Sequence, residues 1–147
     1  SIAMRILALD VGRRRIGMAI SDPSGMLARP LGTVTVGDTD APVLVAKEIV
    51  RLRDEDDGLA EVVVGLPRHL DGTRSEQTAA VEAFIAELRL RIDLPLVTED
   101  ERLSSREAES RLAVRQKDWR KRKTQLDAAA AAVILQDYLD RKSRLTF

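Results

Sequence analysis

The part of the sequence that most constrains the fold is a pair of apolar runs near its start, joined by a short basic turn. Residues 5–10 read RILALD and residues 16–21 read IGMAIS, with VGRRR between them. Continuous apolar runs of this length predict buried strands, and Gly12 suits a turn that needs a positive φ. The segment therefore predicts a β-hairpin. It also leaves the carboxylate of Asp10 at the end of a buried strand, where a charge requires a partner.

The next segment extends this hairpin. The turn signal DPSG at residues 22–25 and the β-rich run LGTVTV at residues 31–36 predict a third, antiparallel strand. Apolar residues then recur at helical spacing over residues 43–52, and Gly58 is expected to act as the C-terminal stop of that helix. The first half of the chain is thus a three-stranded meander followed by a helix.

Two strand and helix units follow. EVVVGLP at residues 61–67 predicts a buried strand, and Thr73 and Glu76, which have the spacing of a capping box, predict the start of a helix. The inner stripe of that helix consists of Val81, Phe84, Ile85 and Leu88. LPLVTEDE at residues 94–101 predicts the last strand.

The C-terminal third is predicted to be mainly helical. Ser104 and Glu107 repeat the capping-box spacing at the start of a helix through about residue 114, and residues 115–123 are interpreted as a charged loop. The alanine-rich segment from residue 124 predicts the strongest helix. Strand and helix units after an antiparallel meander predict an α/β fold: a mixed five-stranded sheet, three strands antiparallel and two parallel, with helices on both faces.

Length and composition exclude several classes. The 147 residues fit one domain, expected over residues 4–147, because residues 1–3 precede Met4 in the manner of a cloning scar. The sequence has no cysteine, which excludes disulfides, zinc-thiolate sites and thiol nucleophiles and fits a cytoplasmic protein. No apolar run approaches the roughly 20 residues of a membrane span, so no membrane partner is expected.

The formal net charge of zero hides an uneven distribution. Residues 1–101 carry six more acidic than basic side chains, whereas residues 102–123 carry six more basic than acidic ones. This asymmetry indicates a surface that faces a polyanion. The alternative is a solvated helical face.

Acidic residues gather at predicted strand ends. Asp10 ends the first strand, Glu99, Asp100 and Glu101 end the last one, and Asp127 falls in the first turn of the final helix. In open α/β sheets, ligands bind beyond the carboxyl ends of the parallel strands. Neighbouring ionised carboxylates require a cation, and oxygen ligands without cysteine favour Mg²⁺ or Mn²⁺ over zinc.

Each acid also has a purely structural interpretation. Asp10 could pair with an arginine at positions 13–15, and Glu101 could pair with the arginine that follows it. Asp127 could belong to a helix cap that begins at Thr124. The acids together, beside a basic segment, are better explained by a metal site that acts on a phosphate backbone.

Four motifs carry a resemblance to a known family. LALDVGRRRIGMAISDP is similar to the opening D-x-G-x-x-R-I-G-x-A-x-S-D of the YqgF/RuvX family, ribonuclease H-like proteins described as Holliday junction resolvase-like and as pre-16S rRNA nucleases. VVVGLPRHLDGTRSEQ, EDERLSSREAESRL and LDAAAAAVILQDYL resemble its V-V-G-L-P-x-x-x-D-G-T, D-E-R-L-T-T and V-D-x-x-A-A-x-x-I-L motifs in the same order. The departures are Ser104 and Ser105 for threonines, Leu126 for valine and the basic pair at residues 68–69.

The resemblance implies a ribonuclease H-like fold with Asp10, Glu101 and Asp127 as the catalytic and metal-binding triad. Two Mg²⁺ or Mn²⁺ ions about 4 Å apart would then activate a water and stabilise the leaving oxygen. The implied contacts to the nucleic-acid backbone come from Arg13, Arg14, Arg15, Arg102, Arg115, Lys117, Arg120, Lys121, Arg122 and Lys123. The implied substrate is precursor rRNA or branched DNA, and the branched-DNA alternative asks for a homodimer with two sites.

Two other function classes compete with this one. The D-x-G turn also resembles the phosphate loop of actin-like ATPases, but those enzymes need two copies of the fold and this chain holds one. A non-catalytic RNA- or ribosome-binding module with the same fold is excluded only by measured activity. Trp119 could stack on a base or anchor its segment, and His69 is expected in an exposed loop rather than in catalysis.

Overall fold

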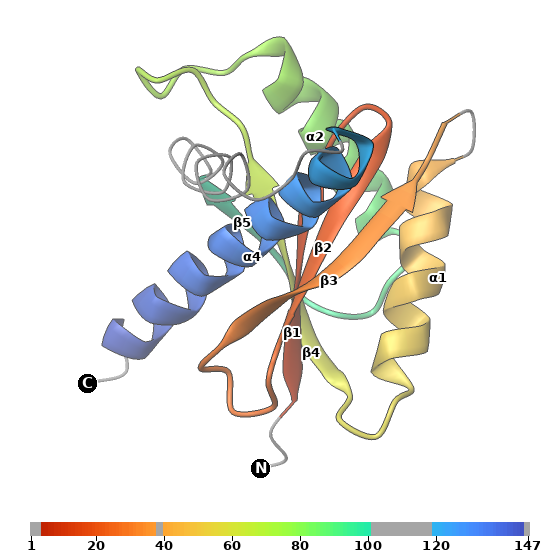
Figure 1. Cartoon of the computed structure of the whole chain (residues 1–147), viewed down its shortest axis with the longest axis vertical. Coiled ribbons are helices and arrows are strands. Elements are labelled where there is room, and N and C mark those ends of the chain that lie inside the picture. Colours follow the sequence, from red (N-terminus) through yellow and green to blue (C-terminus); the bar gives the residue numbers. More distant parts are fainter. Residues whose placement is uncertain (1–3, 38–39, 101–118, 146–147) are drawn as a thin grey trace.

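The computed structural model describes residues 4–37, 40–100 and 119–145 (Figure 1). Its elements in chain order are β1 (Arg5–Val11), β2 (Arg15–Ser21), β3 (Ala28–Thr35), α1 (Ala41–Arg53), β4 (Leu59–Leu66), α2 (Glu76–Arg89), β5 (Leu96–Asp100) and α4 (Trp119–Leu145). The five strands form one sheet in the order β3-β2-β1-β4-β5. β2 is antiparallel to β1 and β3, whereas β4 is parallel to β1 and β5. The predicted mixed sheet is confirmed.

The alternation of side chains along β1 explains why helices cover both faces. Leu7 and Leu9 point to one face and join the apolar core beneath α1 and α2. Ile6 and Ala8 point to the other face, where α4 crosses the sheet diagonally (Figure 1). Helix α4 contributes to this second core the buried side chains of Ala131, Ile134, Leu135 and Leu139. Apolar burial on two faces fixes the register of the central strand, because a shift by one residue would exchange the two sets.

The turn between β1 and β2 is tight, but for a different reason than predicted. Gly12 does not have a positive φ. Its backbone N–H donates to the carbonyl of Arg15 at 3.0 Å, and a Cβ at Gly12 would lie 2.8 Å from that same oxygen. The turn therefore needs glycine for close approach of the backbone rather than for left-handed geometry.

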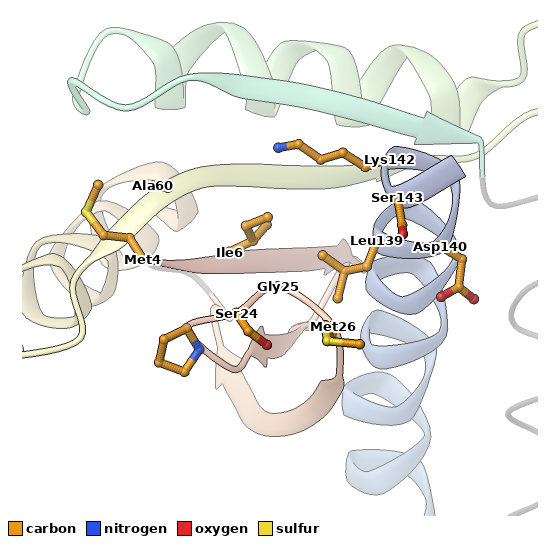
Figure 2. Close-up of a pocket in the computed structure, with 11 residues that line it drawn as sticks. Met4, Ile6, Ser24, Gly25, Met26, Ala60, Leu139, Asp140, Lys142 and Ser143 are labelled. Atoms are coloured by element: carbon orange, nitrogen blue, oxygen red, sulfur yellow. The ribbon is translucent and has the colours of Figure 1, made fainter. Parts of the chain in front are cut away.

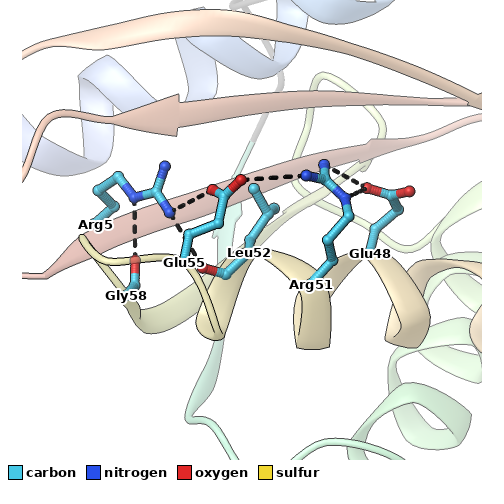
Figure 3. Close-up of polar contacts among 6 residues, drawn as sticks. All are labelled: Arg5, Glu48, Arg51, Leu52, Glu55 and Gly58. Carbon is cyan, nitrogen blue, oxygen red and sulfur yellow. Dashed lines mark hydrogen bonds and ion pairs between the residues drawn. The ribbon is translucent and has the colours of Figure 1, made fainter.

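The connection from α1 to β4 is organised by Arg5, a buried charged residue of β1 (Figure 3). Its guanidinium donates to the carbonyls of Gly58 and Leu52, each at 3.1 Å, and to Glu55 at 2.9 Å. The prediction that Gly58 stops α1 is wrong, because the helix ends at Arg53. Gly58, with a φ of 61°, instead lies in the turn that follows.

The start of α2 also differs in detail from the prediction. The N-cap is Ser75, which exchanges hydrogen bonds with Thr78, and not Thr73 with Glu76. Thr73 is unavailable because its hydroxyl and its backbone N–H both donate to the carboxylate of Asp71, at 2.7 and 2.9 Å. The predicted inner stripe from Val81 to Leu88 is buried as expected.

The last helix begins earlier than predicted. The backbone is helical from Trp119 onward, so the predicted charged loop over residues 115–123 is wrong for its second half. Residues 115–118 and the helix predicted from Ser104 lie outside the described residues. Because α4 starts at Trp119, Asp127 lies eight residues into the helix and not in its first turn. The capping interpretation of Asp127 is therefore wrong.

Candidate active site

The candidate site lies on the α4 face of the sheet, at the carboxyl end of β1. Asp10 alternates with Ile6 and Ala8, so its half-buried side chain points toward α4. Asp10 pairs directly with Gly17 of β2, and directly paired residues in antiparallel strands project to the same face with Cβ atoms about 4.5–5.5 Å apart. Gly17 therefore marks the position next to Asp10 on this face.

Helix α4 passes over Gly17 at unusually short range. A Cβ at Gly17 would lie 2.0 Å from the carbonyl oxygen of Asp127 and 3.0 Å from the amide nitrogen of Ala128. The backbone of Asp127 thus occupies the space of the missing side chain. With the spacing of paired residues, it lies no more than roughly 8 Å from the Cβ of Asp10. Two of the three predicted acids, 117 positions apart in the sequence, are brought to one place.

The carboxylate of Asp127 is held by Arg15, at the start of β2. The Nε of Arg15 donates to Oδ2 of Asp127 at 2.7 Å, and the two side chains are 23% and 28% exposed. Arg15 is therefore an ion-pair partner within the site, which sequence reasoning missed. The sequence predicts Arg15 only as a contact to the nucleic-acid backbone and as one of three arginines that could form an ion pair with Asp10. No spacing rule could have found a pair that joins residues so far apart in the chain.

The other predicted site residues fall into three groups. Arg13 and Arg14 are exposed in the turn between β1 and β2, which follows Asp10 along the chain. Glu101, Arg102, Arg115 and Lys117 lie outside the described residues. Residues 120–123 belong to the first turns of α4 by their backbone. His69 is exposed in the loop after β4, as expected.

A second acidic residue of the α4 face, Glu99 of β5, lies outside the predicted triad. Its side chain is only 4% exposed, and Oε1 accepts a hydrogen bond from Arg141 of α4 at 2.5 Å. Oε2 is buried and has no hydrogen-bond partner among the residues that the structure describes. The alternation of Glu99 with Val97 could have placed it on this face from the sequence, although it could not have supplied the partner on α4.

Beside Glu99, the same helix neutralises a third acid, Glu61 of β4. The hydroxyl of Tyr138 and the ammonium of Lys142 both donate to Oε1 of Glu61 at 2.8 Å. Burial and, next, the hydrogen bond to Glu61 raise the pKa of Tyr138 to about 12. Glu61 and Glu99 therefore anchor the C-terminal half of α4, whereas Asp10 and Asp127 meet near its N-terminal half.

Two pockets of the structure lie outside the candidate site. A pocket of about 510 Å³ is lined by Met4, Ile6 and Ala60 at the amino ends of the central strands and by Met26 and Leu139 (Figure 2). This pocket is at the opposite end of β1 from Asp10. Another, of about 490 Å³, adjoins residues 11–13 on the face covered by α1 and α2. Neither of these two pockets is lined by Asp10 or Asp127.

The carboxylates of the site can be compared with those that the predicted Mg²⁺ or Mn²⁺ ion would need. Among the residues that the structure describes, no group of three or more His, Cys, Asp or Glu side chains could hold an ion. Asp10 and Asp127 supply two carboxylates on one face, and the predicted third ligand, Glu101, is beyond the described part. Oxygen ligands of this kind fit Mg²⁺ or Mn²⁺.

No helix in the described part of the chain is long and apolar enough to cross a membrane.

The sheet order β3-β2-β1-β4-β5, with helices on both faces, is that of the ribonuclease H-like fold. The fold is similar to that of T. thermophilus RuvC solved in complex with a Holliday junction substrate, with a TM-score of 0.56 over 95% of this chain and 96% of that one. At 13% identity this likeness shows the fold alone. A family model described as "RuvX: Holliday junction resolvase" matches residues 4–141. The chain belongs to this RuvX (YqgF) family, as the resemblance implied.

Relatives match this chain over nearly the whole length of both sequences. A protein of Geobacillus kaustophilus is 41% identical over 95% of this chain and 99% of its own. A protein of Anaeromyxobacter dehalogenans is 43% identical over the same shares. Both bear the name "Putative pre-16S rRNA nuclease".

Proposed function

We propose that this chain is a metal-dependent nuclease that hydrolyses phosphodiester bonds of precursor 16S rRNA, with residues 4–147 forming a single nuclease domain. One observation supports the proposal above the others. The close approach of α4 to Gly17 brings Asp127 to the face of the sheet that carries Asp10. The name shared by the relatives indicates the substrate.

The roles of the residues follow from this placement. Asp10 and Asp127, with Glu101, would hold Mg²⁺ or Mn²⁺ through carboxylate oxygens. When bound, such ions polarise a phosphoryl oxygen and make a water nucleophilic at neutral pH. Arg13 and Arg14, exposed in the turn that follows Asp10, contact phosphates of the strand and fix its position. The strand and helix that carry the acids keep their geometry rigid.

Conservative substitutions of the acids test the proposal. Asp10→Asn, Glu101→Gln and Asp127→Asn should each abolish cleavage of an RNA that carries the precursor 16S end, and each should weaken calorimetric Mn²⁺ binding. The matched control is Asp140→Asn, an exposed acid of α4 at the opposite end of β1, which should leave both readouts unchanged. Mn²⁺ binding equal to that of the parent in any of the three variants would remove that residue from the site.

The choice of substrate needs its own comparison. The parent protein in Mg²⁺ or Mn²⁺ should cleave the RNA faster than a matched four-way DNA junction or a linear duplex. Faster, paired nicking of the junction by a dimeric protein would replace RNA by branched DNA as the substrate. Binding of all three substrates without cleavage of any would favour a non-catalytic binding module.

The basic segment gives a further check on substrate binding. Changing Lys and Arg to Ala within residues 115–123 should weaken binding to every nucleic acid and flatten its dependence on salt, because each phosphate contact releases counterions. The position of cleavage should stay the same. Unchanged salt slopes would show that this segment does not contact phosphates.

A further inference from the structure

The ion pair between Arg15 and Asp127 raises a question that the proposed function does not answer. Arg15 donates to Oδ2 of Asp127 at 2.7 Å, and both side chains are about three-quarters buried. If Asp127 holds a divalent cation, a guanidinium already occupies one of its two oxygens. A positive charge at this distance also repels a cation beside the same carboxylate. Arg15 and the metal therefore compete for Asp127.

The pair is not needed to hold α4 on the sheet. The helix is fixed by its apolar cluster from Ala131 to Leu139 and by the contacts of Tyr138 and Arg141 with β4 and β5. The backbone of Arg15 is held in place without the ion pair. The carbonyl of Arg15 accepts a hydrogen bond from the N–H of Gly12, and strand β2 pairs with both β1 and β3. The side chain of Arg15 can therefore leave Asp127 while strand and helix stay in place.

A second partner for Arg15 is available once the substrate binds. A guanidinium presents several N–H donors in a planar fork that matches phosphate oxygens as well as carboxylate oxygens. Arg15 begins the strand that directly follows the turn with the exposed Arg13 and Arg14. A phosphate bound at this turn would therefore lie only one or two residues from Arg15 along the chain.

We infer that Arg15 exchanges partners: it pairs with Asp127 in the metal-free protein and moves to a phosphate of the substrate when a divalent cation takes the carboxylate. This inference rests on the proposed function, since it needs a metal ion at Asp127. The metal frees Arg15 for the substrate, and the substrate frees Asp127 for the metal. Linkage then requires each ligand to tighten the binding of the other by the same factor. Arg15 is a positioning residue that couples the two binding events.

The test measures this coupling without relying on turnover. Calorimetry gives the Mn²⁺ affinity of the full chain, alone and with saturating RNA of the precursor end, in titrations after which gel electrophoresis shows the RNA to be intact. For the parent protein we expect the RNA to tighten Mn²⁺ binding at least about fivefold, the lower end of usual coupling. In Arg15→Gln, Mn²⁺ should bind the RNA-free protein at least about fivefold more tightly than it binds the parent, and the RNA should add little.

Two further variants separate this role from a structural one. Arg51→Gln removes an exposed arginine of α1 that pairs with Glu48 and has no role in the proposed site, and it should keep the coupling. Arg15→Lys keeps a cation beside Asp127, so its Mn²⁺ affinity without RNA should stay near that of the parent. Urea unfolding checks that both variants of Arg15 are folded.

The possible failures are distinguishable. Mn²⁺ affinity in Arg15→Gln that is equal to or lower than in Arg15→Lys would overturn the exchange, while leaving the metal site intact. Coupling that persists in Arg15→Gln would also overturn it. Parent-like Mn²⁺ binding by Asp127→Asn would instead refute the metal site at Asp127, and with it both this inference and that part of the proposed function.

Discussion

The substitution Gly17→Ala tests the contact on which the candidate site depends. An added Cβ would lie 2.0 Å from the carbonyl oxygen of Asp127, whereas non-bonded heavy atoms usually approach to about 3.5 Å. The helix would have to move by roughly 1.5 Å to make room. The obstructing atoms belong to the backbone of a long packed helix, so no side-chain rotation relieves the clash. Overpacking of a core costs about 1–3 kcal/mol, and for this contact we expect a loss of about 3 kcal/mol in the free energy of unfolding.

Urea unfolding measures that loss, and Mn²⁺ calorimetry of the folded variant reports whether Asp127 has moved away from Asp10. Gly25→Ala is the matched control. Gly25 has a φ of 73° with nothing within 4 Å of its added Cβ, so backbone strain alone should cost about 1–2 kcal/mol and leave Mn²⁺ affinity unchanged. If Gly17→Ala unfolds like the parent and binds Mn²⁺ equally well, α4 does not pass over Gly17 as described, and the placement of Asp127 beside Asp10 fails.

Two further predictions concern charged groups outside the site. Arg5→Met should lower the free energy of unfolding by about 1–2 kcal/mol, because it removes the side-chain donors to the carbonyls of Gly58 and Leu52, of which Leu52 keeps the backbone N–H of Glu55. Glu55→Gln should have a much smaller effect, since that side chain is exposed, and equal losses in urea unfolding would refute this account of Figure 3. The pKa of Asp22 is lowered from 3.8 to about 2, first by the backbone N–H of Leu27 and then by Ser24. Its stabilising contribution is therefore complete above pH 3.8 and lost as the pH falls through about 2. Parent and Asp22→Asn should differ in unfolding free energy at neutral pH and converge near pH 2, and a difference that persists there would contradict the assignment.

The elements that the sequence predicted best are those whose signal is local. β1, β2 and β4 are short continuous apolar runs, and their length and the turn residues that flank them favour strands over helices. The stripe of α2 follows equally from periodicity. The cap of α2 was misplaced because two hydroxyl residues, Thr73 and Ser75, compete for the role, and only the three-dimensional structure shows that Asp71 binds the first.

The start of α4 was misplaced for a different reason. Residues 119–123 read WRKRK and have no apolar stripe, and the interpretation as a loop followed from that polarity. Lys and Arg nevertheless have good intrinsic helix propensity, so such a segment extends a helix that is nucleated by the alanine-rich part after it. This error also affected the interpretation of the site. Because the helix is already formed at Trp119, Asp127 does not lie in its first turn.

The acids of the site could be chosen from the sequence, but the reason that they meet lies in residues that carry no chemistry. The strand residues that face α4 include Ala8, Gly17 and Ala19, which are all small. The helix packs against them with Ala128 and Ala131, which are also small. Small side chains on both surfaces allow the helix backbone to approach the sheet closely, whereas larger ones would hold the two apart. The same closeness brings the carboxylate of Asp127 within reach of Arg15. The alanine-rich composition of α4 is thus a requirement of the candidate site as well as of helix propensity, and replacing Ala128 or Ala131 by larger apolar residues should disturb Mn²⁺ binding even where the fold survives.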